Sequence, residues 1–353
     1  MNPVQLGSSQ ASGAGMVALQ NATQVQFTES DRIIWEEDLA SFVPPRFFDA
    51  HVHLWSDDHL PVAHPRRNQL IACDMALTQA WNRRFFPGRE VDYLVLGMPV
   101  PGVDVQAHNR FVAEQTQTFP NARKHRLVTP QCRTPEIEAD IKAYGFGGLK
   151  PYRLFATTGD ANQCRIHEFL THEQMELAND LGLWVTMHLS RYHGCADEHN
   201  LKDLEEYTQR RYPRIRWILA HCARSFTYWP ISKAVDRLRQ LPNIWYDSSA
   251  VSDVMSHYTL FKHEDHRRIL FGTDNLTANS FHGQYVAMGR FWYQIETPEY
   301  AKQSNIHCDQ RPILAIYQQL LSMKHAAKLA ELSPQQVEDI FLNNATRAFG
   351  LAW

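Results

Sequence analysis

The chain has 353 residues, of which 44% are hydrophobic and 21% charged, as in globular proteins with a substantial core. This composition excludes disorder as the main state. The 35 basic and 38 acidic side chains nearly cancel to a formal net charge of −3, which excludes an overall attraction to nucleic acid or to an anionic membrane. No apolar run approaches the roughly 20 residues that a membrane-spanning helix needs.

The N-terminal segment differs in composition from the rest of the chain. Its first 28 residues carry no charged side chain and are rich in Ser, Gln, Ala and Gly. We interpret residues 1–29 as a flexible arm, either poorly ordered or docked on a partner subunit, and residues 30–353 as one domain. The six cysteines form no CxxC pair, so we expect reduced thiols and a cytoplasmic protein.

Eight short apolar runs alternate with amphipathic segments, which indicates βα units around a parallel sheet. The runs lie at residues 47–53, 93–98, 126–129, 147–150, 183–188, 216–220, 243–246 and 269–272. Helices are predicted between them, for example from the capping residue Thr171 to Leu181, and from Pro230 to Pro242. We therefore predict an α/β fold, a (β/α)₈ TIM barrel with a C-terminal helical extension, whose active site lies at the C-terminal ends of the strands. An open doubly wound sheet competes, but no GxGxxG turn follows the first strand.

Histidine and aspartate stand at several of these strand ends. His51 and His53 are two positions apart in the first strand, so they share one face, which in a closed barrel points toward the axis. His188 ends the fifth strand and Asp274 follows the eighth. Three imidazoles and a carboxylate suit Zn²⁺ and tolerate Mn²⁺ or Fe²⁺. We predict one divalent metal, zinc in the first place, held by these four residues.

His221 follows the sixth strand and has two alternative roles. It either binds a second metal or hydrogen-bonds the activated water and the developing oxyanion, and we favour the second role. A divalent ion lowers the pKa of bound water to about 7, and a nearby carboxylate can shuttle its proton. We expect Asp274 to be that shuttle, so Asp274 and His221 are the candidate catalytic residues.

This ordered set of residues resembles the amidohydrolase superfamily, specifically the amidohydrolase-2 branch that includes relatives of aminocarboxymuconate-semialdehyde decarboxylase. The closing run Asn343–Leu351 is similar to the C-terminal signature of that branch, and the resemblance covers roughly residues 47–351. It implies a metal-dependent barrel enzyme, either a hydrolase or a non-oxidative decarboxylase, and often a homodimer.

Lys150 ends the predicted fourth strand. In binuclear members of the superfamily a lysine there is carbamylated and bridges two metals, whereas in the branch that this chain resembles it need not bind metal. We expect an ammonium group that neutralises nearby carboxylates, and chemistry at one metal. A second metal is expected only if Lys150 is carbamylated.

Three arginines stand just past strand ends, namely Arg153, Arg191 and Arg224. Guanidinium groups bind carboxylates with two parallel hydrogen bonds, so this clustering predicts an acidic small-molecule substrate, with Arg191 and Arg153 as the first candidates. Trp55 and Tyr152 are candidate aromatic walls of the same pocket, although barrel rims also carry such residues for packing.

The leading hypothesis is metal-assisted hydrolysis of a small anionic molecule. The sequence does not separate it from non-oxidative decarboxylation of an aromatic or dienyl carboxylic acid at the same site. A binding protein with a structural metal is a third alternative. A phosphoesterase or nuclease is a fourth, disfavoured because Lys150 stands where an acidic ligand is expected and no basic stripe is present. The expected partners are a small-molecule substrate and a second copy of the chain.

Overall fold

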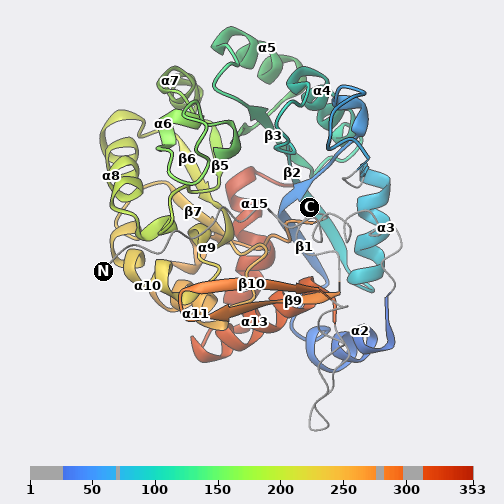
Figure 1. The fold of residues 1–353 in the computed structure, drawn as a ribbon. Coiled ribbons are helices and arrows are strands. Elements are labelled where there is room, and N and C mark those ends of the chain that lie inside the picture. The colour runs from blue at the N-terminus through green and yellow to red at the C-terminus, as the bar shows by residue number, and fades with distance from the viewer. Residues whose placement is uncertain (1–26, 69–71, 276–281, 297–312, 353) are drawn as a thin grey trace.

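Eight parallel strands form a barrel with helices on its outside (Figure 1). The computed structural model describes residues 27–68, 72–275, 282–296 and 313–352. The strands are β1 (Arg46–His53), β2 (Glu90–Leu96), β3 (Arg123–Val128), β4 (Gly148–Pro151), β5 (Trp184–Met187), β6 (Arg216–Leu219), β7 (Ile244–Asp247) and β8 (Ile269–Leu270). Each strand pairs in parallel with the next one along the chain. All eight predicted strands are present, so the (β/α)₈ prediction is confirmed.

The barrel closes between the segment after β8 and β1. The backbone N–H of Ala50 donates to the carbonyl of Phe271 at 2.8 Å, and Val52 forms a parallel bridge with Asn275. The N–H of Asp274 donates to the carbonyl of His51 at 2.9 Å. Closure therefore brings the end of the predicted eighth strand directly beside the His51–His53 pair.

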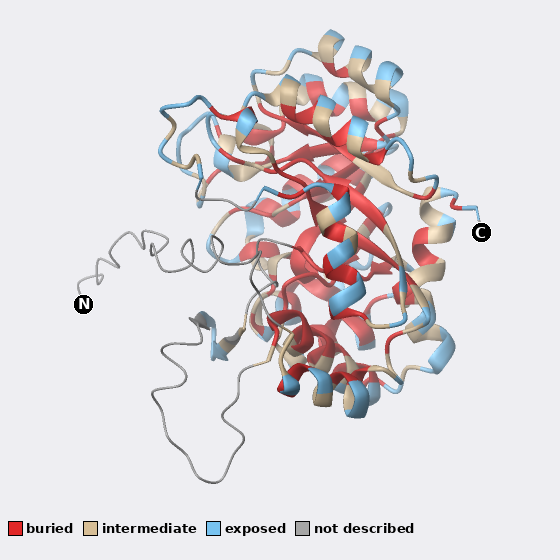
Figure 2. Cartoon of the chain, turned by 90° about the vertical axis from the view of Figure 1, so that its right-hand side faces the viewer, coloured by how far each residue is buried: buried red, intermediate tan, exposed pale blue. Residues whose placement is uncertain are grey.

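The helices pack their apolar faces on the barrel (Figure 2). Those that follow successive strands are α3 (Met75–Phe85), α4 (Val105–Thr116), α5 (Thr134–Tyr144), α6 (Ile166–Phe169), α7 (His172–Leu181), α8 (Glu198–Glu206), α10 (Tyr228–Leu238), α11 (Val254–His263) and α13 (Ala315–Leu329). The predicted cap Thr171 and stop Gly182 bound α7, where Gly182 has a φ of 63°. Pro230 lies in the first turn of α10, which ends four residues before Pro242. The shorter α-helices of the described residues are α2 (Glu29–Ile34), α9 (Ala220–Arg224), α14 (Pro334–Glu338) and α15 (Asn344–Phe349).

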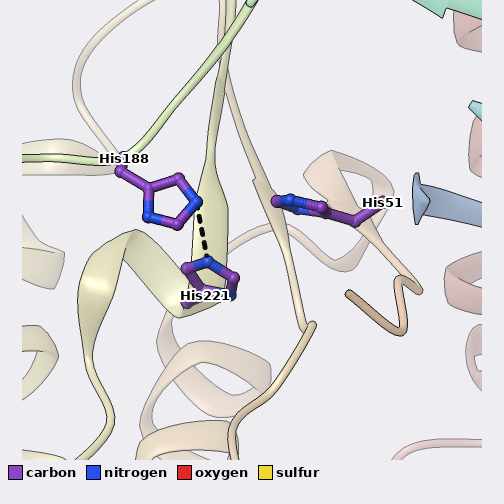
Figure 3. Close-up of side chains that lie close together, drawn as sticks. All are labelled: His51, His188 and His221. Carbon is purple, nitrogen blue, oxygen red and sulfur yellow. Dashed lines mark hydrogen bonds between the residues drawn. The ribbon is translucent and has the colours of Figure 1, made fainter. Parts of the chain in front are cut away.

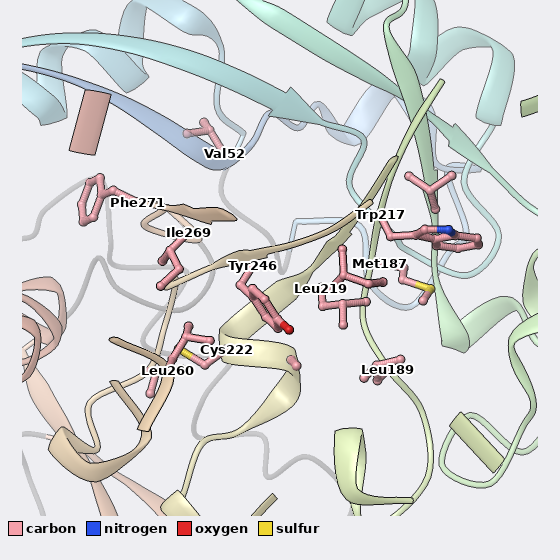
Figure 4. Close-up of a cluster of buried hydrophobic side chains, with 14 of the residues drawn as sticks. Val52, Met187, Leu189, Trp217, Leu219, Cys222, Tyr246, Leu260, Ile269 and Phe271 are labelled. Atoms are coloured by element: carbon pink, nitrogen blue, oxygen red, sulfur yellow. The ribbon is translucent and has the colours of Figure 1, made fainter. Parts of the chain in front are cut away.

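Alternate strand residues divide the core into two layers. Side chains such as Val52, Met187, Trp217, Tyr246 and Phe271 belong to the large cluster that also includes helix residues (Figure 4). Their neighbours along the strands form a smaller cluster together with α15, made of Phe48, Ala50, Leu94, Leu96, Trp184, Ile218, Leu270, Ala345 and Leu351. The C-terminal helix thus packs against the inward-facing strand residues, and the polar residues gather at the opposite, C-terminal end of the strands.

A register shift in β1 changes which residues face inward. The pairing of β1 with β2 is irregular between Asp49 and Val52. Below the shift Phe48 and Ala50 belong to the inner cluster, whereas above it Val52 belongs to the outer cluster. Bulges of this kind re-aim side chains next to active sites. Because of this register shift, His51 and His53 face into the C-terminal end of the barrel, above the residues of the smaller apolar cluster.

Two expectations concern the chain outside the barrel. The predicted N-terminal arm lies mostly outside the described residues, and α2 begins at Glu29 after its cap Thr28. After β8 the chain forms an antiparallel hairpin of β9 (Gly283–Met288) and β10 (Phe291–Glu296).

Among the described helices none is long and apolar enough to cross a membrane.

Candidate metal centre

Three imidazoles converge at the C-terminal end of the barrel (Figure 3). The Nε2 atoms of His188 and His221 lie 2.9 Å apart, and His51 points toward this pair from the other side. One nitrogen from each ring lies within 4.8 Å of the other two. The residues come from β1 and from the ends of β5 and β6, so the barrel assembles them from distant parts of the chain.

A second group shares His51. The Oδ1 atom of Asp274 lies 3.6 Å from Nε2 of His51 and 3.5 Å from Nε2 of His53. These three residues also have ligand atoms within 4.8 Å of one another. The structure therefore brings all five sequence-predicted residues together, but as two overlapping triads, with His221 in one of them.

The hydrogen bonds of the imidazoles fix which nitrogen carries a proton. The Nδ1 atom of His53 lies 3.2 Å from the carbonyl of Leu96, and Nδ1 of His221 lies 2.9 Å from the carbonyl of Ser249. A carbonyl only accepts, so each Nδ1 donates, and in a neutral ring Nε2 then presents a lone pair. Burial lowers the pKa of both histidines, which favours the neutral ring.

The resulting arrangement fits a cation. With Nδ1 donating, Nε2 of His51, of His53 and of His221 each presents a lone pair, and those of His51 and His53 lie close to the carboxylate of Asp274. Acceptor atoms that lie this close repel unless a positive charge lies between them. Neutral imidazole and ionised carboxylate are also the forms that bind a divalent metal. The donor set of these residues therefore matches a divalent metal site.

Asp247, the last residue of β7, and Ser249, two residues further on, hydrogen-bond the sides of the histidines that face away from the metal centre. Oδ2 of Asp247 lies 2.9 Å from Nδ1 of His51, and Oδ1 accepts the backbone N–H of His221 at 3.0 Å. The hydroxyl of Ser249 donates to Asp247 at 2.5 Å. Burial alone would raise the pKa of Asp247, but its contacts with His51, His221 and Ser249 bring it below its ordinary value. Sequence reasoning missed Asp247, although it directly follows the predicted seventh strand.

Asp49 joins the first and last strands below the site. Its carboxylate accepts the backbone N–H of His51 at 3.1 Å, the N–H of Thr273 at 2.9 Å and the hydroxyl of Thr273 at 2.5 Å. Burial raises the pKa of Asp49 to about 7. Asp274, the residue after Thr273, has a φ of 57°, a conformation that non-glycine residues adopt mainly where the surroundings impose it. Asp49 thus holds the turn that presents Asp274.

The residues labelled α9 include a left-handed turn rather than a right-handed helix. His221, Cys222, Ala223 and Arg224 have φ values of 60°, 51°, 58° and 62°. The left-handed conformation costs about 1–2 kcal/mol for each such residue, and several in succession are rare. Hydrogen bonds from His221 N–H to Asp247 and from Ser225 N–H to the carbonyl of His221 (2.8 Å) hold the turn. It carries both His221 and Arg224.

Lys150 lies at the base of the centre. It is fully buried, and its Nζ atom lies 3.4 Å from Nε2 of His51. Burial lowers the pKa of Lys150 to about 8, against the opposing attraction of Asp247 and Asp274. That its ammonium group neutralises nearby carboxylates stays a prediction.

The aromatic and arginine candidates have different surroundings. The ring of Tyr152 lies 4.5 Å from that of His188, centroid to centroid, and Nζ of Lys150 lies 5.7 Å from the centroid of the Tyr152 ring. Trp55 is buried in a small cluster with Leu60, Met98 and Val100, and its indole N–H donates to Asp57 at 3.0 Å. Tyr152 therefore adjoins the metal centre, while the role of Trp55 as a pocket wall stays a prediction.

The three arginines divide into one ion-paired residue and two without a carboxylate. Arg191 donates to Asp197 at 2.7 Å. Arg153 donates to the carbonyl of Ala161 at 2.8 Å, and Arg224 to that of Leu189 at 2.8 Å. Within the described residues neither Arg153 nor Arg224 forms an ion pair, and Nε of Arg153 is buried without a hydrogen-bond partner. Burial, and next the charge of Arg153, lower the pKa of Arg224 to about 10.

A (β/α)₈ barrel with neutral imidazoles and an aspartate at the C-terminal ends of its strands defines a metal-dependent barrel enzyme. The amidohydrolase-2 family model, described as amidohydrolase, matches residues 48–351. The chain belongs to this amidohydrolase family, and it is a metal-dependent hydrolase or decarboxylase. No curated protein matches it.

Solved structures with the same fold include three decarboxylases. The dihydroxybenzoic acid decarboxylase of Polaromonas sp. JS666, with manganese and the inhibitor 2-nitroresorcinol, is 14% identical over 87% of this chain and 98% of its own, with a TM-score of 0.57. The 2,6-dihydroxybenzoate decarboxylase of Rhizobium is 12% identical over 87% and 99%, with a TM-score of 0.54. The 5-carboxyvanillate decarboxylase of Novosphingobium aromaticivorans, with manganese and 4-hydroxy-3-methoxy-5-nitrobenzoic acid, is 12% identical over 88% and 96%, with a TM-score of 0.53. At these identities the likeness shows the fold.

Proposed function

We propose that the chain catalyses non-oxidative decarboxylation of an aromatic or dienyl carboxylic acid. The observation that carries this proposal is that Arg153 and Arg224, which lie beyond the ends of β4 and β6, donate to backbone carbonyls and form no ion pair within the described residues. Such arginines can bind an anionic substrate, because guanidinium groups form strong, paired hydrogen bonds with carboxylates. The aromatic ring of Tyr152 offers a surface for a flat substrate. The activities of the three similar structures named above support the same reaction.

The proposed ligands of one divalent metal are His51, His53, His188 and Asp274. We propose zinc, with manganese or iron as the alternatives; two of the similar structures hold manganese. When bound, the cation supplies a positive charge that polarises substrate oxygens. A second metal would require carbamylation of Lys150.

In the proposed reaction, Asp274 takes up a proton from solvent and passes it to the substrate carbon that bears the carboxylate, which returns Asp274 to its ionised form. The bond between that carbon and the carboxylate breaks, its electron pair stays on the carbon to hold the new hydrogen, and CO₂ leaves. His221 stabilises the negative charge that develops on the substrate. Arg153 and Arg224, with Arg191 as a further candidate, hold an anionic group of the substrate, while Tyr152 and Trp55 are its proposed aromatic walls.

Hydrolysis is the second candidate, favoured by the description of the matching family. Here Asp274 takes a proton from the attacking water and passes it to the leaving group, so the same residues serve a different bond. The substrate is then an anionic amide, lactone or related compound.

An isotope experiment separates the two reactions. The protein is loaded with Zn²⁺ or Mn²⁺ and incubated in D₂O with hydroxybenzoates, dienyl carboxylates, lactones and amides. For decarboxylation we expect release of CO₂ from a carboxylic acid and one deuterium atom on the product carbon that had carried the carboxylate. Acid release from the lactones or amides without CO₂ would favour hydrolysis, and no turnover in Asp274→Asn is expected in either case. A protein that binds metal but turns over no compound would contradict both reactions.

We further propose that the chain is a cytoplasmic homodimer. The predicted N-terminal arm, residues 1–29, lies mostly outside the described residues and ends where α2 begins at Glu29. The homodimer follows from the resemblance to the amidohydrolase-2 branch. A reducing compartment is supported by the five cysteines of the described chain, all of them free. Light scattering on the purified protein tests the dimer, and removal of residues 1–26 tests whether the arm contributes to it.

A further inference from the structure

The described side chains of the hairpin β9–β10 are largely exposed to solvent, and Trp292, at 38%, is the least exposed of the three aromatic residues of β10. Its strands pair Trp292 with Ala287 and turn at Gly289, whose φ is 61°. Phe291 and Tyr293 are 58% and 48% exposed, and their rings stack with centroids 6.5 Å apart. Because neighbouring strand residues point to opposite faces, Trp292 lies on the other face.

On that other face, three rings lie in a row. The ring of Trp292 lies 4.7 Å from the ring of Phe226, with 30° between their planes. Phe226 in turn stacks on His221, with centroids 5.2 Å apart and 29° between the planes. Phe226 therefore joins the hairpin to a ring of the metal centre. It lies two residues beyond the left-handed turn that carries His221.

Two further contacts hold the hairpin in place. At its tip, the guanidinium of Arg290 lies 4.3 Å from the ring centroid of Trp229, at the start of α10. At its base, Asp31 of α2 accepts from Nε2 of His282 at 2.7 Å and from the N–H of Leu314 at 2.8 Å. His282 and Leu314 also form an antiparallel bridge with each other. The hairpin is thus fixed at its base and its tip.

We propose that the hairpin is a positioning element of the active site, and that Trp292 acts by holding Phe226 against the imidazole of His221. The inference rests on the proposed function only in that His221 takes part in catalysis, and it applies to decarboxylation and hydrolysis alike. Trp292 does not act on the reacting atoms. It limits the orientations of the His221 ring, together with the hydrogen bonds of Nδ1 to Ser249, the contact of Nε2 with His188 and the stacking of His51 on the ring.

The test compares Trp292→Ala with Trp292→Phe and with Tyr293→Ala, which removes a ring from the opposite face of the same strand. We expect Trp292→Ala to lower kcat about 10- to 100-fold, because small misplacements of a catalytic group have effects of this size, while KM changes less than about threefold. Trp292→Phe restores most of the rate, and Tyr293→Ala keeps the rate of the parent.

A second readout does not depend on knowing the substrate. Each variant is loaded with Co²⁺, and circular dichroism checks that it is folded. The visible absorption bands of Co²⁺ report the geometry of its donors, and displacement of His221 should alter them because its Nε2 atom lies 2.9 Å from Nε2 of the proposed ligand His188. We expect the bands to shift in Trp292→Ala and to return in Trp292→Phe. A Trp292→Ala protein with the bands and kcat of Tyr293→Ala would overturn the inference. If the parent turns over neither class of substrate, the proposed function fails, and the Co²⁺ bands still decide this inference.

Discussion

The Nδ1 atom of His51 lies 2.9 Å from Oδ2 of Asp247, which joins an imidazole of β1 to a carboxylate of β7 across 196 positions of the chain. The other oxygen of the same carboxylate accepts the backbone N–H of His221 at 3.0 Å. One buried aspartate therefore orients the ring of His51 and holds the backbone of His221 at the metal centre. Hydrogen bonds of this kind fix the tautomer and the direction of a metal-binding ring.

Replacement of Asp247 is expected to weaken metal binding. In Asp247→Asn the side-chain amide cannot accept from all the donors that the carboxylate satisfies, so the ring of His51 loses its fixed orientation. We expect the Kd for Zn²⁺ to rise about 10- to 100-fold, measured by competition with a chelator. The matched control is Asp236→Asn, at a side chain that is 85% exposed. Equal Kd values in the two variants would show that Asp247 does not orient His51.

Gly272 allows the segment after β8 to lie close to His51. A Cβ atom at position 272 would lie 3.0 Å from Cβ of His51 and 3.3 Å from Cβ of Ser249. We expect Gly272→Ala to displace His51 and to reduce metal occupancy, as measured by mass spectrometry of the metal content. Gly147→Ala serves as the control, because its added Cβ meets no atom within 4 Å. Full occupancy in Gly272→Ala would mean that the backbone adjusts without moving the ligand.

The arginines are expected to differ in their effect on substrate binding. Arg153→Gln and Arg224→Gln each remove a cation that has no carboxylate among the described residues, so KM for an anionic substrate should rise about 10- to 100-fold, since charge-assisted hydrogen bonds contribute about 1.5–3 kcal/mol. Arg191 already pairs with Asp197 at 2.7 Å, so we expect Arg191→Gln to change KM less than either. Steady-state kinetics of the three variants test this order, and a larger effect at Arg191 would reverse the assignment.

Removal of the metal is expected to lower both activity and thermal stability. A cation that binds only the folded chain stabilises it by about 2.7 kcal/mol at a free concentration one hundred times its Kd. Dialysis against a chelator should therefore lower Tm by several degrees, and Zn²⁺ or Mn²⁺ should restore it. In His51→Ala, which belongs to both triads, Tm should no longer respond to the metal. A metal-dependent Tm in this variant would show that the cation binds elsewhere.

The buried His257 is expected to make folding sensitive to acid. Burial lowers its pKa from 6.5 to about 4. Between these values the unfolded chain takes up a proton that the folded chain does not, so the free energy of unfolding falls by up to about 1.4 kcal/mol per unit as pH decreases from 6.5 to about 4. This contribution is absent above pH 6.5. In His257→Gln the slope should be smaller, whereas the exposed control His263→Gln should keep it. Denaturant unfolding at several pH values measures the slope, and equal slopes in the two variants would contradict the prediction.

The barrel and the outline of the metal centre could be predicted from the sequence because both depend on local patterns. Apolar runs separated by helical segments give strands in sequential order, and parallel strands place their C-terminal residues at one end. The positions of His51, His53, His188, His221 and Asp274 at those ends are visible in the chain itself, and the structure brings all five together. Asp247 was visible in the same way but was overlooked.

Other features were decided only by the tertiary structure, because they depend on how distant segments meet. The register shift in β1 comes from its pairing with β2, and the left-handed turn at His221 is held by Asp247 from β7. The contact of Trp292 with Phe226 depends on how the hairpin folds back over the barrel. A sequence pattern records which residues can form a strand or bind a metal. Which side chain supports a given ring follows from barrel closure and from the packing of inserted segments, and these are not local properties of the chain.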